Sequence, residues 1–173
     1  MTYETILSGG GVAFDIEIGG TVASGFVVGG GMQVQGMSDP KVEIRPDPGN
    51  SSNLFVTKKG FGSFLFGPFI DWFPDAEGGG HLGLMLGIGA LGLDSEVTPN
   101  PNTGLPEGNG KATTGIGGSI WGGYDFWVAD QWSLGGALRL TGISAERKLY
   151  YVDDGKGRDS LGSIQILFTG LYH

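Results

Sequence analysis

The stretch GVAFDIEIGG, residues 11–20, decides the fold class because its residues alternate in character. Every second residue from Val12 to Ile18 is apolar, whereas Asp15 and Glu17 occupy alternate positions. This period of two predicts a β-strand with one oily face and one acidic face. A soluble barrel or sandwich turns the oily face inward, whereas a membrane barrel turns it toward lipid and keeps the acids inside.

The composition of the chain favours strands over helices. The 173 residues suit one domain, 1–173, and include 36 glycines, which are unfavourable in helices. The formal net charge of −8 argues against nucleic acid as a partner, because phosphate binding needs clustered Lys and Arg. The absence of cysteine excludes disulfides and thiolate metal sites.

The alternation continues along the chain and predicts seven strands joined in an up-and-down antiparallel meander. Short and long connections alternate, which places the tight turns at one end and the long polar loops at the other, as in outer-membrane barrels. The predicted strands span about 9–19, 26–37, 54–73, 80–94, 112–128, 131–146 and 160–173.

The composition of the second, non-oily face of each predicted strand indicates whether the oily face meets lipid or the protein interior. This second face carries mostly Gly, Ala and Ser, which suit a narrow lumen better than a surface in bulk water. We therefore expect a transmembrane β-barrel whose oily face meets lipid. The residues expected to face lipid are Phe14, Ile16, Phe64, Phe66, Leu84, Leu86, Ile120, Leu138, Ile166 and Phe168.

Charged residues predicted on the inner face form a candidate lumen network. Its expected members are Asp15, Glu17, Asp71, Asp125 and Arg139. Buried charges must be paired or hydrated, so Arg139 is expected to pair with one or two of the acids.

Aromatic residues gather near the short-turn end and predict an interfacial girdle. The members expected are Phe69, Trp72, Phe73, Tyr124, Trp127, Trp132 and Tyr172.

Three segments, GGYDFWVADQWSLG at 122–135, GPFIDWFPD at 67–75 and LGSIQILFTGLYH at 161–173, carry a resemblance to known proteins. Together they resemble the small outer-membrane β-barrel proteins of myxobacteria and their relatives, within the broad OmpA-type class. The resemblance implies eight strands, a signal peptide, location in the bacterial outer membrane, and a C-terminal strand recognised by the barrel-assembly machinery.

The chain departs from that pattern in two respects. Seven strands are predicted rather than eight. Either residues 1–8 are the remnant of an outer loop that follows a missing first strand and signal peptide, or TYETILS at 2–8 contributes a distorted extra strand. We favour the explanation that the first strand and the signal peptide are missing. In addition, His173 follows the terminal aromatic residue, which weakens the match to an assembly signal.

Motifs that would indicate catalysis or cofactor binding are explained by simpler structures. GIGALG at 87–92 has dinucleotide-site spacing but is followed by a loop rather than a helix. DDGKGRD at 153–159 lacks the spacing of a calcium loop. Neither His81 nor His173 has an evident nucleophile and acid partner. We expect no catalytic residue, no cofactor and no metal.

The expected role is therefore structural or interactive, through outer loops near 38–53, 95–111 and 147–159. The expected partners are outer-membrane lipid and the barrel-assembly machinery, and the partner of the outer loops is unidentified. Two alternatives remain at this stage. The first is a narrow pore for small solutes, and the second is a soluble lipocalin-like barrel with an apolar ligand inside.

Overall fold

The protein is an all-β structure built mainly from one seven-stranded antiparallel sheet. The computed structural model describes residues 4–38, 41–45, 58–75, 78–95, 112–148 and 156–172. The strands of the large sheet are β2 (Gly11–Ala23), β3 (Phe26–Ser38), β5 (Lys58–Trp72), β6 (Gly80–Ser95), β7 (Thr113–Ala129), β8 (Trp132–Lys148) and β9 (Lys156–Tyr172).

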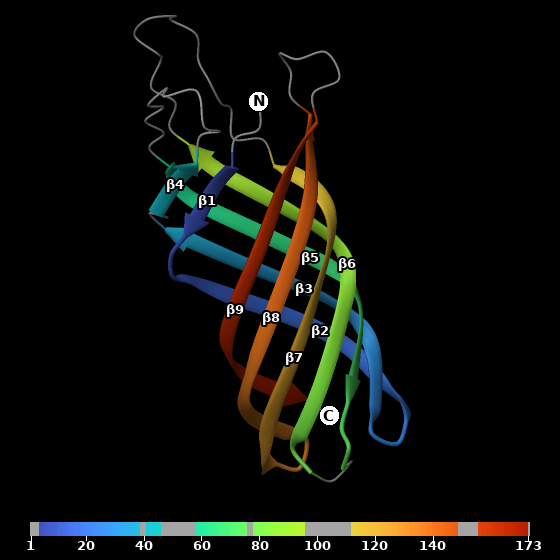
Figure 1. Ribbon diagram of the computed structural model, residues 1–173. Helices are drawn as coiled ribbons and strands as arrows, with labels where there is room; N and C mark the ends of the chain where they lie inside the picture. Colours follow the sequence, from blue (N-terminus) through green and yellow to red (C-terminus); the bar gives the residue numbers. More distant parts are fainter. Residues whose placement is uncertain are drawn as a thin grey trace, which may run out of the picture.

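The sheet is a meander in which each strand pairs with its neighbours in the chain, in the order β2-β3-β5-β6-β7-β8-β9 (Figure 1). The all-β, up-and-down antiparallel architecture predicted from the alternation is confirmed. At one end, β2 and β3 are joined by only Ser24 and Gly25, and β7 and β8 by Asp130 and Gln131. Gly25 has a φ of 74°, a left-handed conformation that glycine adopts without strain.

Several boundaries differ from those expected from the sequence. Residues 21–23 were expected in a short connection but continue β2, and Lys156–Asp159 belong to β9 rather than to a loop. The segment 38–53 was expected as a loop, yet Lys41–Arg45 forms β4. Apart from Val22, where the β2–β3 register shifts, these residues continue a ladder with a paired neighbour, and this tertiary pairing overrides polar composition.

A second, two-stranded sheet consists of β1 (Glu4–Ser8) and β4. Ser8 pairs with Lys41 while Gly11 pairs with Met37, so this sheet prolongs the β2–β3 hairpin at the long-loop end. Residues 4–8 therefore extend β2 at its N-terminal end, and they do not add an eighth strand beside it.

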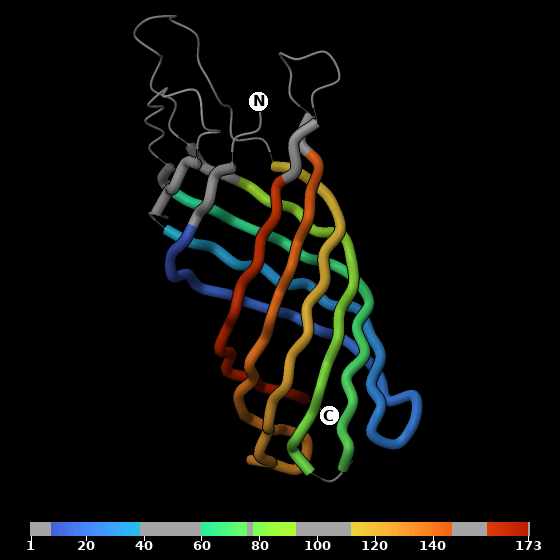
Figure 2. The backbone as a smooth tube through the Cα atoms, in the orientation of Figure 1, coloured from blue at the N-terminus to red at the C-terminus, as the bar shows by residue number. Residues whose placement is uncertain are grey.

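The large sheet is curled into a half-barrel, with β7, β8 and β9 passing in front of β2, β3 and β5 (Figures 1 and 2). Alternate side chains face the concave and convex sides. The concave side holds the buried apolar cluster, which comprises Leu65, Phe69, Met85, Leu91, Trp121, Ile143 and Ala145.

The two outer strands, β2 and β9, each pair with one neighbour in this sheet. Six antiparallel steps separate them, so they run in the same direction, from the long-loop end to the short-turn end. Direct closure would therefore bring two parallel strands together.

The described residues contain no helix long and apolar enough to cross a lipid bilayer.

Candidate functional site

The convex face carries the large apolar side chains. All ten residues that the sequence assigned to lipid are at least 36% exposed, and Phe168 reaches 98%. Central convex positions such as Leu84, Ile120 and Leu138 have apolar or glycine neighbours on the same face. Charged residues with the same orientation, such as Glu146, lie near the long-loop end.

Aromatic residues near the short-turn end pair on the convex surface. Phe26 stacks on Trp72 with ring centroids 6.2 Å apart, and Trp132 meets Tyr172 edge-on at 5.3 Å. Tyr124 packs against the neighbouring Phe126 at 4.8 Å. Four of the seven aromatic residues predicted as a girdle, namely Trp72, Tyr124, Trp132 and Tyr172, thus lie on the exposed surface at this end.

The other three aromatic residues lie on the concave side of the sheet, although Trp127 is 50% exposed and lies, like Phe73, at the short-turn end, so the interfacial girdle itself stays a prediction. Phe69 is buried in the concave cluster, where its ring centroid is 6.3 Å from that of Trp121. Phe73 and Trp127 line a cavity at the short-turn end of the concave side. Phe69 in β5 and Trp127 in β7 have odd numbers in strands whose odd residues face inward, and Phe73 directly follows β5, so the alternation determines their side more strongly than their aromatic character does.

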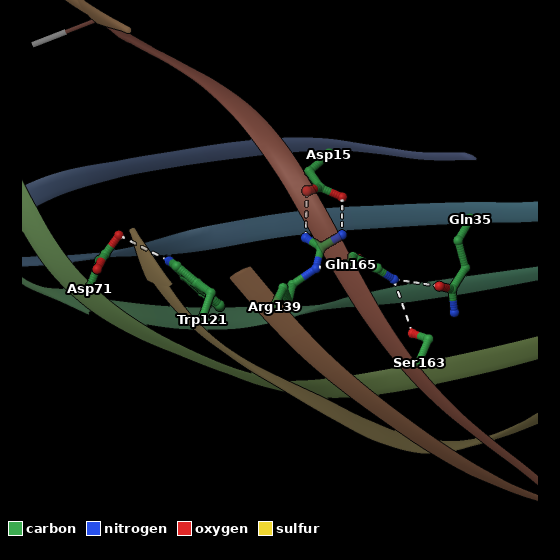
Figure 3. A network of polar contacts seen from close by, with 7 residues as sticks. All are labelled: Asp15, Gln35, Asp71, Trp121, Arg139, Ser163 and Gln165. Atoms are coloured by element: carbon green, nitrogen blue, oxygen red, sulfur yellow. Dashed lines mark hydrogen bonds and ion pairs between the residues drawn. The ribbon is translucent and has the colours of Figure 1, made fainter. Parts of the chain in front are cut away.

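Arg139 joins the two outer strands across the concave side (Figure 3). Its guanidinium donates to both carboxylate oxygens of Asp15 on β2, with Nη1 to Oδ2 at 2.5 Å and Nη2 to Oδ1 at 2.8 Å. Its Nε donates to Gln165 Oε1 on β9 at 2.6 Å. Such a forked arginine–carboxylate contact fixes geometry as well as charge.

Gln165 extends this network to a further strand. Its side-chain amide donates to Gln35 Oε1 on β3 and to Ser163 Oγ at 3.1 Å (Figure 3). The Arg139 network, defined as Arg139, Asp15, Gln165, Gln35 and Ser163, therefore crosses the middle of the half-barrel with side chains.

His81 is the centre of a second polar group, nearer to the short-turn end. Its Nδ1 lies 2.8 Å from Asp71 Oδ2, and its Nε2 lies 3.2 Å from Asp125 Oδ2. Trp121 Nε1 donates to Asp71 at 3.3 Å, and Thr169 donates its hydroxyl to Asp125. We call these five residues the His81 cluster.

The five predicted lumen charges thus fall into separate groups. Asp15 and Arg139 meet each other, whereas Asp71 and Asp125 meet His81. Glu17 lies on the same face of β2, above Gly31 beside Met85, and outside the Asp15–Arg139 ion pair.

Sequence reasoning dismissed His81 and did not single out Gln165, Thr169 or Trp121. The available signal was the alternation, since each of these residues has the inward orientation in its strand. Their partners could not be recognised, because they come from other strands whose register the sequence does not specify.

A cavity of about 270 Å³ opens at the short-turn end beneath the His81 cluster. Its walls include Thr21, Val27, Phe73, Asp125, Trp127 and Ser133.

The chemistry available to the described residues is limited. They contain no group of three or more His, Cys, Asp and Glu side chains arranged to hold a metal ion. Both ring nitrogens of His81 face carboxylates rather than a hydroxyl, which is not the arrangement of a base beside a nucleophile. GIGALG lies within β6, and part of DDGKGRD, residues 153–155, lies outside the described residues, as does His173.

No known family model matches the sequence, and no curated protein or solved structure matches the chain.

Proposed function

We propose that the chain is a membrane-embedded β-barrel of the bacterial outer membrane, with a structural or surface-interaction role at its long-loop end. The observation that carries this proposal is the distribution of polarity across the sheet. The convex face is apolar and exposed on all seven strands, whereas Arg139, His81 and Asp125 are enclosed on the concave side. A protein in water would be expected to show the reverse arrangement, because continuous apolar patches of this extent promote association.

The height of the apolar face also suits a bilayer. On β7, apolar convex residues run from Ile116 to Phe126, which is ten residue steps. At about 3.3 Å per step this is about 33 Å along the strand. With a typical tilt of about 40°, the vertical height is about 25 Å, the usual height of the apolar band in outer-membrane barrels.

The directions of β2 and β9 support the resemblance to eight-stranded barrels of the OmpA class. One further strand, running opposite to both, would pair with each in an antiparallel ladder and leave no open edge. Closure is required in lipid because unpaired backbone groups there cost several kcal/mol each. In this proposal, the Arg139 network limits how far apart the two outer strands lie.

The two alternatives fit the interior less well. A water-filled pore needs an open path, but the Arg139 network and the apolar side chains of Leu65 and Met85 fill the concave side. A lipocalin-like barrel needs an apolar inner wall for its ligand, and here the exposed apolar side chains lie on the convex wall.

Refolding tests the proposal against a soluble barrel. We expect β-structure by circular dichroism, and a gel mobility that changes on heating, when the chain is refolded into detergent micelles, and aggregation in plain buffer. A monodisperse β-protein in plain buffer would contradict the membrane proposal. Planar-bilayer conductance would separate the pore from the non-conducting form, for which we expect no stepwise currents.

A substitution pair sharpens this test. Ile120→Arg places a charge at the centre of the convex face and should cost about 2–4 kcal/mol of folding free energy in phosphatidylcholine vesicles, measured by urea titration. Ser160→Arg has the same orientation but lies at the long-loop end, where the cost should be about 0–1 kcal/mol. Equal costs at the two positions would refute the depth dependence that lipid imposes.

A further inference from the structure

The His81 ring lies between two carboxylates, and the structure points to a use for this arrangement. We propose that His81 is a proton-operated clasp, which fastens β5, β6, β7 and β9 together at the short-turn end when both of its ring nitrogens carry protons. Nδ1 makes a hydrogen-bond contact of 2.8 Å with Asp71, and on the other side of the ring Nε2 lies 3.2 Å from Asp125 Oδ2, an ion-pair distance without hydrogen-bond alignment. A neutral imidazole has only one N–H and can donate to only one carboxylate.

The surroundings of the ring are acidic or neutral. The charged groups that act on His81 are Asp71 on β5, Asp125 on β7 and Glu17 on β2. Two further neighbours of the ring are uncharged: Phe73 stacks on it with centroids 5.1 Å apart and an interplanar angle of 11°, and Gly123 lies beside Nε2. The imidazolium thus offsets carboxylates that would otherwise repel one another across the ring.

The clasp connects several parts of the short-turn end. Asp71 is the next-to-last residue of β5 and His81 is the second residue of β6, and Asp125 also accepts a hydrogen bond from the hydroxyl of Thr169 on β9. The segment between β5 and β6 is fastened on both sides through the backbone. Phe73 N donates to Gly25 O at 2.7 Å, and Asp125 N donates to Gly79 O at 2.9 Å.

The sign of the pH effect follows from the contacts. While the ring carries two protons and both carboxylates are ionised, both contacts are attractive and the clasp stabilises the fold. Raising the pH removes one ring proton, and the stabilisation from the clasp is then lost. The stabilisation from the clasp should therefore be present at a pH below the ordinary titration range of histidine, about 6.5, and should be lost as the pH rises above it.

Nitrogen-15 NMR of the ring tests the clasp directly. The chain has two histidines, so His173→Ala leaves His81 as the sole imidazole signal. In the refolded protein at about pH 5.5, we expect both ring nitrogens to show the protonated signature, because the unperturbed ring titrates at about 6.5 and both carboxylates favour the charged form. A single protonated nitrogen at this pH would overturn the proposal.

Unfolding by urea supplies the energetic test. For the full chain we expect the folding equilibrium constant to fall severalfold from pH 5.5 to 8.5, because loss of one ring proton removes one of the two attractive contacts. His81→Gln should remove most of this dependence, and Asp125→Asn should lower the pH at which the ring loses its second proton. An unchanged pH dependence in His81→Gln would refute the clasp. If that variant does not fold, the NMR signal of the His173→Ala protein and its shift in Asp125→Asn decide.

This inference does not rest on the membrane proposal. The clasp is inside the half-barrel, so its test can be run in whichever solvent, micelle or buffer, the chain folds. A soluble protein with a doubly protonated His81 would retain the clasp and contradict only the membrane proposal.

Discussion

Arg139 is 2% exposed, and its two direct partners come from the two outer strands of the sheet. A charge so enclosed is stable only when its donors are satisfied, and Asp15 and Gln165 provide three of the acceptor contacts. The geometry of this one residue therefore limits how far β2 and β9 can move apart.

Replacing Arg139 should destabilise the fold. Arg139→Met keeps much of the side-chain volume but leaves the Asp15 carboxylate without its cation. Breaking a buried pair costs about 3–5 kcal/mol, and we expect about 2–3 kcal/mol here because the Asp15 side chain is 19% exposed. Urea unfolding of Arg139→Met, Asp15→Asn and the double variant measures this as a coupling energy. An unchanged free energy of unfolding in Arg139→Met would exclude a stabilising ion pair.

Gly83 is required by the aromatic residue opposite it. A Cβ at this position would overlap the Trp121 ring, which pairs across from Gly83 and donates to Asp71. Gly83→Ala should therefore displace the ring and cost about 1–3 kcal/mol. Gly30→Ala is the matched control, because a Cβ there meets no atom within 4 Å. Similar urea midpoints for the two variants would show that the ring does not need this space.

At the residue scale, the sequence predicted orientations better than contacts. The alternation places Asp71, His81 and Asp125 on one side of the sheet, but not at one level along it. Their meeting depends on the registers of β5, β6 and β7, which the sequence pattern does not encode strongly in glycine-rich strands. Phe69 was assigned to the girdle because it is an aromatic residue near the short-turn end, but its side chain is buried in the concave cluster, as the alternation along β5 indicates.

At the element scale, the seven principal strands could be predicted because each keeps its period of two over ten or more residues. The pairing of β1 with β4 could not, because five-residue strands with mixed composition carry little periodic signal. Their pairing is a consequence of the β2–β3 ladder, which lies between the two segments in the chain and brings them side by side.

The outer strands should differ from the inner ones in hydrogen exchange. β6 has a partner on both sides, so nearly all its central amides should be protected. β2 and β9 have one partner each in the large sheet, so alternate amides on their free sides should exchange much faster. Amide exchange measured by NMR on the refolded chain resolves this pattern. Uniform protection along β9 would instead mean that another strand occupies its free edge.

At the scale of the whole molecule, the curl of the sheet decides which residues become neighbours. Gln35 on β3 and Gln165 on β9 hydrogen-bond, although 130 residues separate them in the chain. A flat meander would hold the same strands far apart, since four strands lie between them. The apolar convex face and the filled concave side both follow from this curl.

Cross-linking can test the curl because the natural chain has no cysteine. In the double variant Gln35→Cys with Gln165→Cys, both thiols should point into the concave side, and a short bis-maleimide should join them within one chain. Val34→Cys with Ile166→Cys is the control, since these neighbouring side chains are 40% and 85% exposed on the convex face. Mass spectrometry should find the cross-linked peptide in the first variant alone, because the sheet itself separates the second pair. Equal yields, or none in either variant, would mean that the sheet does not curl as described and that Arg139 does not bridge its outer strands.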